Sequence, residues 1–125
     1  MKKVHVSLNE NSYDVLIEKG LLSNVSNHLD TTKEYVIITD DNIPIEYIAT
    51  IKSQLNVIKT YVMQHGESLK CAEKVNEVID DMLSLSLPRS TTIIALGGGV
   101  VGDFAGFIAS IYMRGIDFVQ IPTSL

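Results

Sequence analysis

The feature that most constrains the fold is a run of glycines placed between two strongly apolar segments. Residues 91–96, Thr-Thr-Ile-Ile-Ala-Leu, are typical of a strand buried on both faces, and Val100–Met113 is typical of a buried helix. Gly97-Gly98-Gly99 joins the two segments, and Gly102 follows close behind. Glycines allow a tight strand–turn–helix connection of this kind, which is common where helices cover a parallel sheet. The sequence therefore predicts an α/β fold.

Segments typical of strands and helices alternate along the rest of the chain. Two alternating segments, Val4–Leu8 and Tyr13–Ile17, predict an N-terminal β-hairpin. Further buried strands are expected at Tyr35–Thr39, Val57–Met63 and Phe118–Pro122, with helices after Pro44 and from about Glu67 to Leu87, ended by Pro88. The apolar residues expected to face the sheet are Ile45, Ile48, Ile51 and Leu55 in the first helix and Leu69, Ala72, Val75, Ile79 and Leu83 in the second. This order implies a Rossmann-like, mainly parallel sheet with helices on both faces.

Charge and cysteine content exclude several classes of protein. The 125 residues suit one domain, and the net charge is −5 at pH 7 with no cluster of Lys and Arg, so no nucleic-acid partner is expected. Cys71 is the only cysteine, which rules out an internal disulfide and favours a reducing cytoplasm. The apolar stretch Ile93–Met113 contains Asp103 near its middle, where a membrane span would make it costly. We therefore expect no membrane association.

The glycine turn carries the clearest chemical signal. Glycines allow a phosphate to approach the backbone without a Cβ clash, and the amides of a first helical turn favour an anion. Gly97, Gly99 and Gly102 also fit the dinucleotide spacing Gly-x-Gly-x-x-Gly. The ordinary Rossmann arrangement uses the first strand and an acid after the next one, whereas this motif comes late and Asp117 precedes its strand. A packing turn remains the alternative to a phosphate site.

Polar residues follow each predicted parallel strand. Because the carboxyl ends of parallel strands meet at one edge of a sheet, these residues are expected to surround one nucleotide. Singly, each has an alternative role in turn formation, helix capping or solvation. The groups are Thr39-Asp40-Asp41-Asn42, His65-Gly66-Glu67, the Gly97–Asp103 turn and Thr123-Ser124.

Together these residues resemble the 3-dehydroquinate synthases. The resemblance spans the whole chain and rests on Gly97–Asp103, Tyr112-Met113-Arg114-Gly115 and Pro122-Thr123-Ser124-Leu125, preceded by Asp40-x-Asn42 and Gly66-Glu67-x-x-Lys70. It implies that residues 1–125 are the NAD-binding domain of a two-domain enzyme, cut short at its C-terminal end and lacking the helical metal and substrate domain. Ser124 stands where the family usually has threonine, and Cys71 where serine is common.

The resemblance also implies which residues contact NAD and substrate. Asp40 and Asn42 would serve the adenosine end, and the glycine turn the pyrophosphate. Arg114 would bind the phosphate of the substrate across a homodimer interface, with a solvated arginine as the alternative. The implied cofactor-binding residues are Asp40, Asn42, Gly66, Glu67, Lys70, Gly98, Gly99, Val100, Val101, Gly102, Asp103, Thr123 and Ser124.

The activity implied by the resemblance is that of a carbon–oxygen lyase in the shikimate pathway. The family converts 3-deoxy-D-arabino-heptulosonate 7-phosphate to 3-dehydroquinate and phosphate, using NAD and zinc or cobalt. Its metal ligands lie beyond the position of Leu125, and His5, His28 and His65 lack ligand spacing, so no metal ligand is assigned here. We expect this chain alone to be inactive. The alternatives are another NAD-dependent sugar-phosphate cyclase and a stand-alone, non-catalytic nucleotide-binding module.

Overall fold

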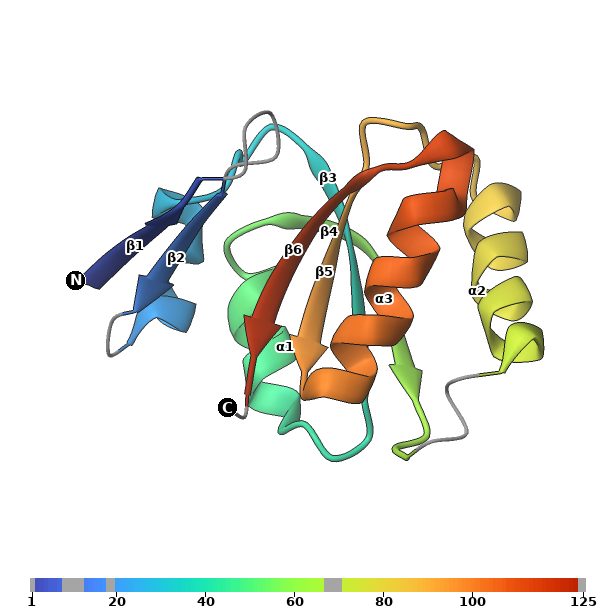
Figure 1. The fold of residues 1–125 in the computed structure, drawn as a ribbon, viewed down its shortest axis with the longest axis horizontal. Coiled ribbons are helices and arrows are strands. Elements are labelled where there is room, and N and C mark those ends of the chain that lie inside the picture. The colour runs from blue at the N-terminus through green and yellow to red at the C-terminus, as the bar shows by residue number, and fades with distance from the viewer. Residues whose placement is uncertain (1, 8–12, 18–19, 67–70, 124–125) are drawn as a thin grey trace.

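A computed structural model of the chain describes residues 2–7, 13–17, 20–66 and 71–123. Its centre is a parallel four-stranded sheet with the strand order β4-β3-β5-β6 (Figure 1). The strands are β3 (Glu34–Asp40), β4 (Asn56–Met63), β5 (Thr92–Gly97) and β6 (Asp117–Pro122). β1 (Lys2–Val6) and β2 (Tyr13–Ile17) pair antiparallel as a separate hairpin. The predicted Rossmann-like sheet and N-terminal hairpin are thus confirmed.

Helices cover both faces of the sheet. They are α1 (Ile45–Lys52), α2 (Ala72–Ser84) and α3 (Gly99–Ile111), with 3₁₀ helices at Leu21–Asn27 and Tyr112–Arg114. In β3, Val36 and Ile38 pack under α2 and α3, whereas Tyr35 and Ile37 pack with Ile51 of α1 on the opposite face. Because successive side chains of a strand point to opposite faces, β3 contributes to the hydrophobic core on each face of the sheet. Among the described residues, no helix has the length and apolar character needed to cross a membrane.

The strand order creates a switch in chain direction between β3 and β5. From β3 the chain passes through α1 to β4 on one side, whereas from β5 it passes through α3 to β6 on the other side. The two connecting helices lie on opposite faces of the sheet, as Figure 1 shows. In open parallel sheets such a switch leaves a crevice beyond the carboxyl ends of the two central strands.

The predicted inward faces of two helices need correction. Ile45 of α1 is 76% exposed, and α2 begins at Ala72, itself exposed, with Leu83 50% exposed. The core residues of α2 are Val75, Val78 and Met82, while Ile79 is partly buried and Leu69 lies outside the described residues. α2 carries two neighbouring apolar stripes, and contacts with the sheet select one of them. The Tyr61 hydroxyl donates to Asp81 Oδ2 at 2.5 Å, which fixes the rotation of α2 against β4.

Two glycines of α3 face side chains of β6. A Cβ at Gly102 would lie 2.7 Å from Gln120 Nε2, and a Cβ at Gly106 would lie 3.3 Å from the Phe118 ring. Four helical residues advance about 6 Å and two strand residues about 6.6 Å, so the two pairs match in spacing. The side chains of Gln120 and Phe118 thus lie over helix residues that have no side chain.

Candidate functional site

The first turn of α3 presents unbonded backbone amides at the edge of the sheet. Gly98 is the N-cap, with φ −81° and ψ −168°, and no side chain caps the helix. The first bond within the helix runs from the Gly102 N–H to the Gly98 carbonyl oxygen at 3.0 Å. The amides of Gly99, Val100 and Val101 therefore have no acceptor within the helix, as at any helix start. Such a turn attracts an anion because its amides and the helix dipole both favour negative charge.

A cavity of about 180 Å³ lies beside this turn. Its lining residues come from β5, α3 and β6: Ala95, Gly97, Gly98, Gly99, Gly102, Gln120 and Pro122. Among the described residues that line it, no side chain carries a charge. The volume is below the roughly 300–1,000 Å³ of a typical ligand pocket, so the cavity suits one part of a larger ligand. A phosphate or pyrophosphate group is of that size and finds backbone donors there.

The glycines of the turn have different neighbours. A Cβ at Gly97 would lie 3.0 Å from Val101 Cβ, so a side chain there would require Val101 to shift. A Cβ at Gly99 would meet no atom within 4 Å. Gly99 is therefore not required by packing, and its missing side chain leaves open space at the helix start. That space is the property a phosphate-binding turn needs.

The exits of β3 and β4 are linked through one carboxylate. Asp41 follows β3, and its Oδ1 accepts the backbone N–H of His65 at 3.1 Å and lies 2.5 Å from His65 Nδ1. The hydrogen bond from the His65 side chain holds the pKa of Asp41 below its ordinary value. Asp40, one residue earlier, accepts the Asn42 N–H at 3.0 Å. These bonds fix the backbone where two neighbouring strands end.

Several residues assigned from the sequence lie at this same edge of the sheet. Asp40 ends β3, Asn42 follows it, and Gly66 comes after β4. Thr123 follows β6, and its N–H donates to the Gly97 carbonyl oxygen at 3.1 Å. Because all four strands are parallel, their exits and the glycine turn share one end of the molecule. Glu67, Lys70 and Ser124 lie outside the described residues.

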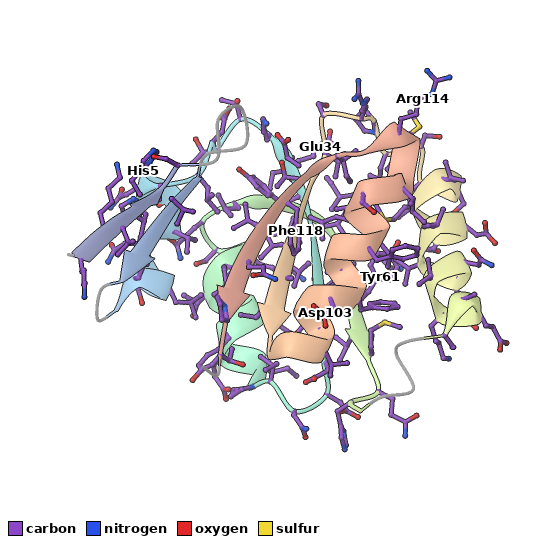
Figure 2. All side chains as sticks on the ribbon, viewed as in Figure 1. His5, Glu34, Tyr61, Asp103, Arg114 and Phe118 are labelled. Atoms are coloured by element: carbon purple, nitrogen blue, oxygen red, sulfur yellow. The ribbon has the colours of Figure 1, made fainter. Side chains whose placement is uncertain are left out.

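Three residues of the turn itself are placed less favourably for a ligand. Val101 is buried in the core, Val100 is half-buried, and neither lines the cavity. Asp103 is exposed (Figure 2) and is the fifth residue of α3, so the first turn contains no acidic side chain. Asp103 therefore lies too far along the helix to complement the dipole at its N-terminus. The helix begins at Gly99, and dipole effects fade beyond the first turn.

Arg114 lies at the opposite end of α3 from the cavity. Figure 2 shows its side chain projecting into solvent beyond the last turn of the helix, far from Asp103. The helix has 13 residues, so about 20 Å of helix separates the two ends at ~1.5 Å per residue. Arg114 has φ 69° and follows Met113 with φ 49°, so two successive residues are left-handed. Within one copy of the chain, Arg114 is not close to the glycine turn.

Three residues that line the cavity are not among the binding residues expected from the sequence: Ala95, Gln120 and Pro122. Ala95 lies in β5, and Gln120 and Pro122 lie in β6, two segments that the sequence predicts as buried strands. The signal for Gln120 was a polar side chain inside the otherwise apolar run Phe118–Pro122. Its partner Gly102 was assigned from the glycine spacing, but the contact between them depends on how α3 lies on β6.

A metal centre does not fit the described part of the chain. Among the described residues, no three His, Cys, Asp or Glu side chains lie close enough together to hold a metal ion. The donors present here are amides and backbone groups, which suit an anion better than a divalent cation.

Comparison with known sequences identifies relatives across the whole chain. A family model described as "3-dehydroquinate synthase N-terminal" matches residues 60–125, just over half of the chain. A curated 3-dehydroquinate synthase from Alkaliphilus metalliredigens is 42% identical over 127 residues, covering 100% of this chain and 36% of the relative. The chain thus spans about a third of the length of the curated relatives it matches.

Solved structures with the same fold include two synthases and several dehydrogenases. A 2-deoxy-scyllo-inosose synthase superposes with a TM-score of 0.88 at 24% identity, over 98% of this chain and 36% of that one. The 2-epi-5-epi-valiolone synthase of Streptomyces hygroscopicus, solved with NAD⁺ and Zn²⁺ bound, has a TM-score of 0.76 and 33% identity, over 95% and 34% of the two chains. With the glycine turn, the strand exits and the family match in agreement, the chain belongs to the 3-dehydroquinate synthase N-terminal family.

Proposed function

We propose that this chain is the NAD-binding domain of a 3-dehydroquinate synthase. The observation that carries the proposal is the open first turn of α3 beside the switch between β3 and β5. The amides of this turn would hold the pyrophosphate, with Gly98 and Gly99 allowing close approach. Asp40 and Asn42, at the exit of β3, would hold the adenosine end. A relative with 33% identity has been solved with NAD⁺ bound, which supports the assignment.

The remaining assigned residues fit this proposal to different degrees. Gly66, Thr123 and, from the resemblance, Glu67, Lys70 and Ser124 would complete the ring of strand exits around the nucleotide. Val100 and Val101 would contribute their backbone amides. Asp103 is the weakest member of the set, because it lies past the first turn and away from the cavity lining.

The whole enzyme would convert 3-deoxy-D-arabino-heptulosonate 7-phosphate to 3-dehydroquinate and phosphate. Bound NAD supplies a reversible hydride acceptor, and this chain would hold and orient the dinucleotide for that purpose. We assign the divalent metal, zinc or cobalt, to the two thirds of the relatives that this chain does not span. Carbon–oxygen lyase activity in the shikimate pathway and a cytoplasmic location, suggested by the single cysteine, belong to the same proposal.

We also propose that Arg114 contacts the substrate phosphate of a second copy in a homodimer. One helix length separates it from the cavity of its own chain, so it would have to act in trans. A guanidinium fork suits a phosphate well, and the left-handed backbone at residues 113 and 114 would set the direction in which the Arg114 side chain leaves the chain.

Replacing Gly99 with valine tests the cofactor site. No protein atom lies within 4 Å of a Cβ at this position, so Gly99→Val should fold normally while filling the space of the pyrophosphate. We expect NAD affinity to fall by at least about tenfold, equal to ~1.4 kcal/mol, in a titration followed by NMR or calorimetry. The matched control is Ser110→Val, an exposed position on the same helix far from the cavity. Unchanged NAD affinity in Gly99→Val would refute the phosphate-binding role of the turn.

Two other functions give different experimental results. Another NAD-dependent sugar-phosphate cyclase would share the cofactor site and differ in substrate, but the curated relatives near 40% identity are 3-dehydroquinate synthases. A stand-alone nucleotide-binding module would bind NAD and act without the remaining two thirds of the relatives. We expect the 125-residue chain to bind NAD weakly and to release no phosphate from the heptulosonate phosphate. Phosphate release by this chain would overturn that expectation.

A further inference from the structure

We propose that Gln120 is a binding residue of the nucleotide site, and that Gly102 is required mainly because it leaves room for the Gln120 carboxamide. The carboxamide would donate from Nε2 to the anionic part of the ligand held at the start of α3. This inference rests on the proposed NAD-binding function. It adds Gln120 to the site and makes the role of Gly102 depend on Gln120.

The register of the sheet brings Gln120 to the α3 side of the cavity. Gln120 pairs with Ala95 of β5, and Ala95 belongs to the core beneath α2 and α3. Side chains of paired residues in a parallel sheet share a face, so Gln120 extends toward α3. Its Nε2 lies 2.7 Å from the place where a Cβ of residue 102 would be. Both residues line the cavity together with Gly98 and Gly99.

The chemistry of the cavity gives this carboxamide a distinct role. The other lining residues are glycines, alanine and proline, so Gln120 supplies the polar side chain among the described lining residues. Its amide group offers two N–H donors and one acceptor oxygen. No hydrogen bond from the described residues engages this group. An uncharged donor beside backbone amides suits a phosphate oxygen. This contact would not discriminate between ligands that differ elsewhere.

The contact also gives Gly102 a different role from the usual one. The third glycine of a dinucleotide turn normally serves close packing of the helix on its strand. Here a Cβ at residue 102 first meets the far end of a flexible side chain rather than backbone. Gly102→Ala should therefore leave the fold intact and displace the Gln120 carboxamide. At Gly106 the corresponding Cβ meets the Phe118 ring at 3.3 Å, with no contact to the cavity.

A double-mutant cycle on the 125-residue chain tests the dependency. NAD affinity is measured for the wild type, Gly102→Ala, Gln120→Ala and the double variant, with unfolding by urea as a check on folding. We expect each single variant to bind NAD about tenfold more weakly, as for loss of one hydrogen bond to a charged group. The double variant should be no weaker than either single one, because both changes remove the same contact. Gly106→Ala is the matched control and should keep its NAD affinity.

The opposite results would overturn the proposal. Additive losses in the double variant would mean that Gly102 serves the ligand directly, and unchanged affinity in Gln120→Ala would remove Gln120 from the site. A titration of ¹⁵N-labelled chain with inorganic pyrophosphate separates this failure from failure of the proposed function. Shifts of the amides of residues 98–102 without a shift of the Gln120 side-chain amide would contradict the role of Gln120 alone. No shifts with pyrophosphate or NAD would contradict the nucleotide site as a whole.

Discussion

The two ends of α3 differ in how the backbone is shaped: the start is rich in glycine, and the other end is left-handed at residues that are not glycine. At the start, Gly97, Gly98 and Gly99 remove side chains and leave backbone amides accessible beside an open space. At the other end, Met113 and Arg114 adopt φ values of 49° and 69° without being glycine. Accessible amides require only that side chains be absent, whereas a left-handed backbone at residues other than glycine requires neighbours that hold it in place.

The left-handed pair at the far end is held by buried contacts. Such conformations cost about 1–3 kcal/mol each for residues other than glycine. Tyr112 is 1% exposed, and its hydroxyl donates to the carbonyl oxygen of Leu87 at 2.7 Å. The Ile116 N–H donates to the Ala109 carbonyl oxygen at 2.8 Å across the same turn. These bonds fix the direction in which Arg114 leaves the helix.

Removing the Tyr112 side chain should have the largest effect on this comparison. We expect Tyr112→Ala to lower the free energy of unfolding by about 3–5 kcal/mol, because the side chain is buried and its hydroxyl is bonded. Unfolding in urea measures the change. Tyr47→Ala is the control, since Tyr47 is 40% exposed and should lose far less stability. Similar losses for both variants would show that the far end of α3 is not held by Tyr112.

Adding one methyl group to the glycine turn should separate stability from binding. Gly97→Ala places a Cβ 3.0 Å from Val101 Cβ, and such overpacking costs about 1–3 kcal/mol of folding free energy. Gly99→Ala places its Cβ in open space and should be close to neutral in stability. Thermal or urea unfolding of the two variants checks the contrast. If Gly97→Ala is as stable as Gly99→Ala, the turn is more adaptable than its geometry implies.

Acid should weaken the structure at the exits of β3 and β4 and leave the C-terminal end of α3 unchanged. This effect should be smaller than those of the Tyr112 and Gly97 substitutions. The pKa of Asp41 is lowered by the hydrogen bond from His65, so its stabilising contribution is present above the ordinary value of 3.8 and is lost as pH falls through the lower folded value. Burial raises the pKa of Tyr112, so its hydroxyl stays protonated in acid and would be affected only by alkali. Hydrogen-exchange protection of the His65 amide should therefore fall below about pH 4, while that of Ile116 stays constant.

Asp41→Asn is the control for this pH dependence. The variant keeps an acceptor oxygen but removes the titrating group, so the acid-dependent loss at His65 should disappear. An equal loss at His65 and Ile116 would indicate general unfolding rather than a local opening at the strand exits.

The positions of the buried strands along the chain could be predicted from sequence, because each strand is a continuous run rich in β-branched residues. Tyr35–Thr39 and Thr91–Leu96 were expected as buried strands, and the structure places β3 and β5 there, at the centre of the sheet. The face of α2 could not be predicted, because apolar residues occupy two adjacent stripes and only the sheet distinguishes Met82 from Leu83. Its end was also misplaced: the helix stops at Ser84, and Ser86 turns the chain with φ 54° before Pro88 is reached.

The candidate site could be predicted from sequence only where its residues form a local motif or directly follow a strand. The glycine turn and the strand exits follow from motifs and from the rule for parallel sheets. Gln120 was not found, because its contact with Gly102 arises from the packing of α3 on β6, residues that are neighbours only after folding. The position of Asp103 past the first turn of α3 could not be predicted either, because the sequence does not fix the residue at which a glycine-rich helix begins.

The pairing of β3 with β5 has a consequence for how the chain acquires this crevice during synthesis. Ile37 pairs with Ile94, so the two central strands come together across α1, β4 and α2. Closing so long a loop raises the contact order and slows folding relative to local elements such as the hairpin of β1 and β2. A nascent chain that has emerged only as far as β4 can pair β3 with β4 but has no crevice to bind a nucleotide. Ligand binding on the ribosome should therefore begin only after β6 has emerged, and it would then select chains whose sheet has closed around β5.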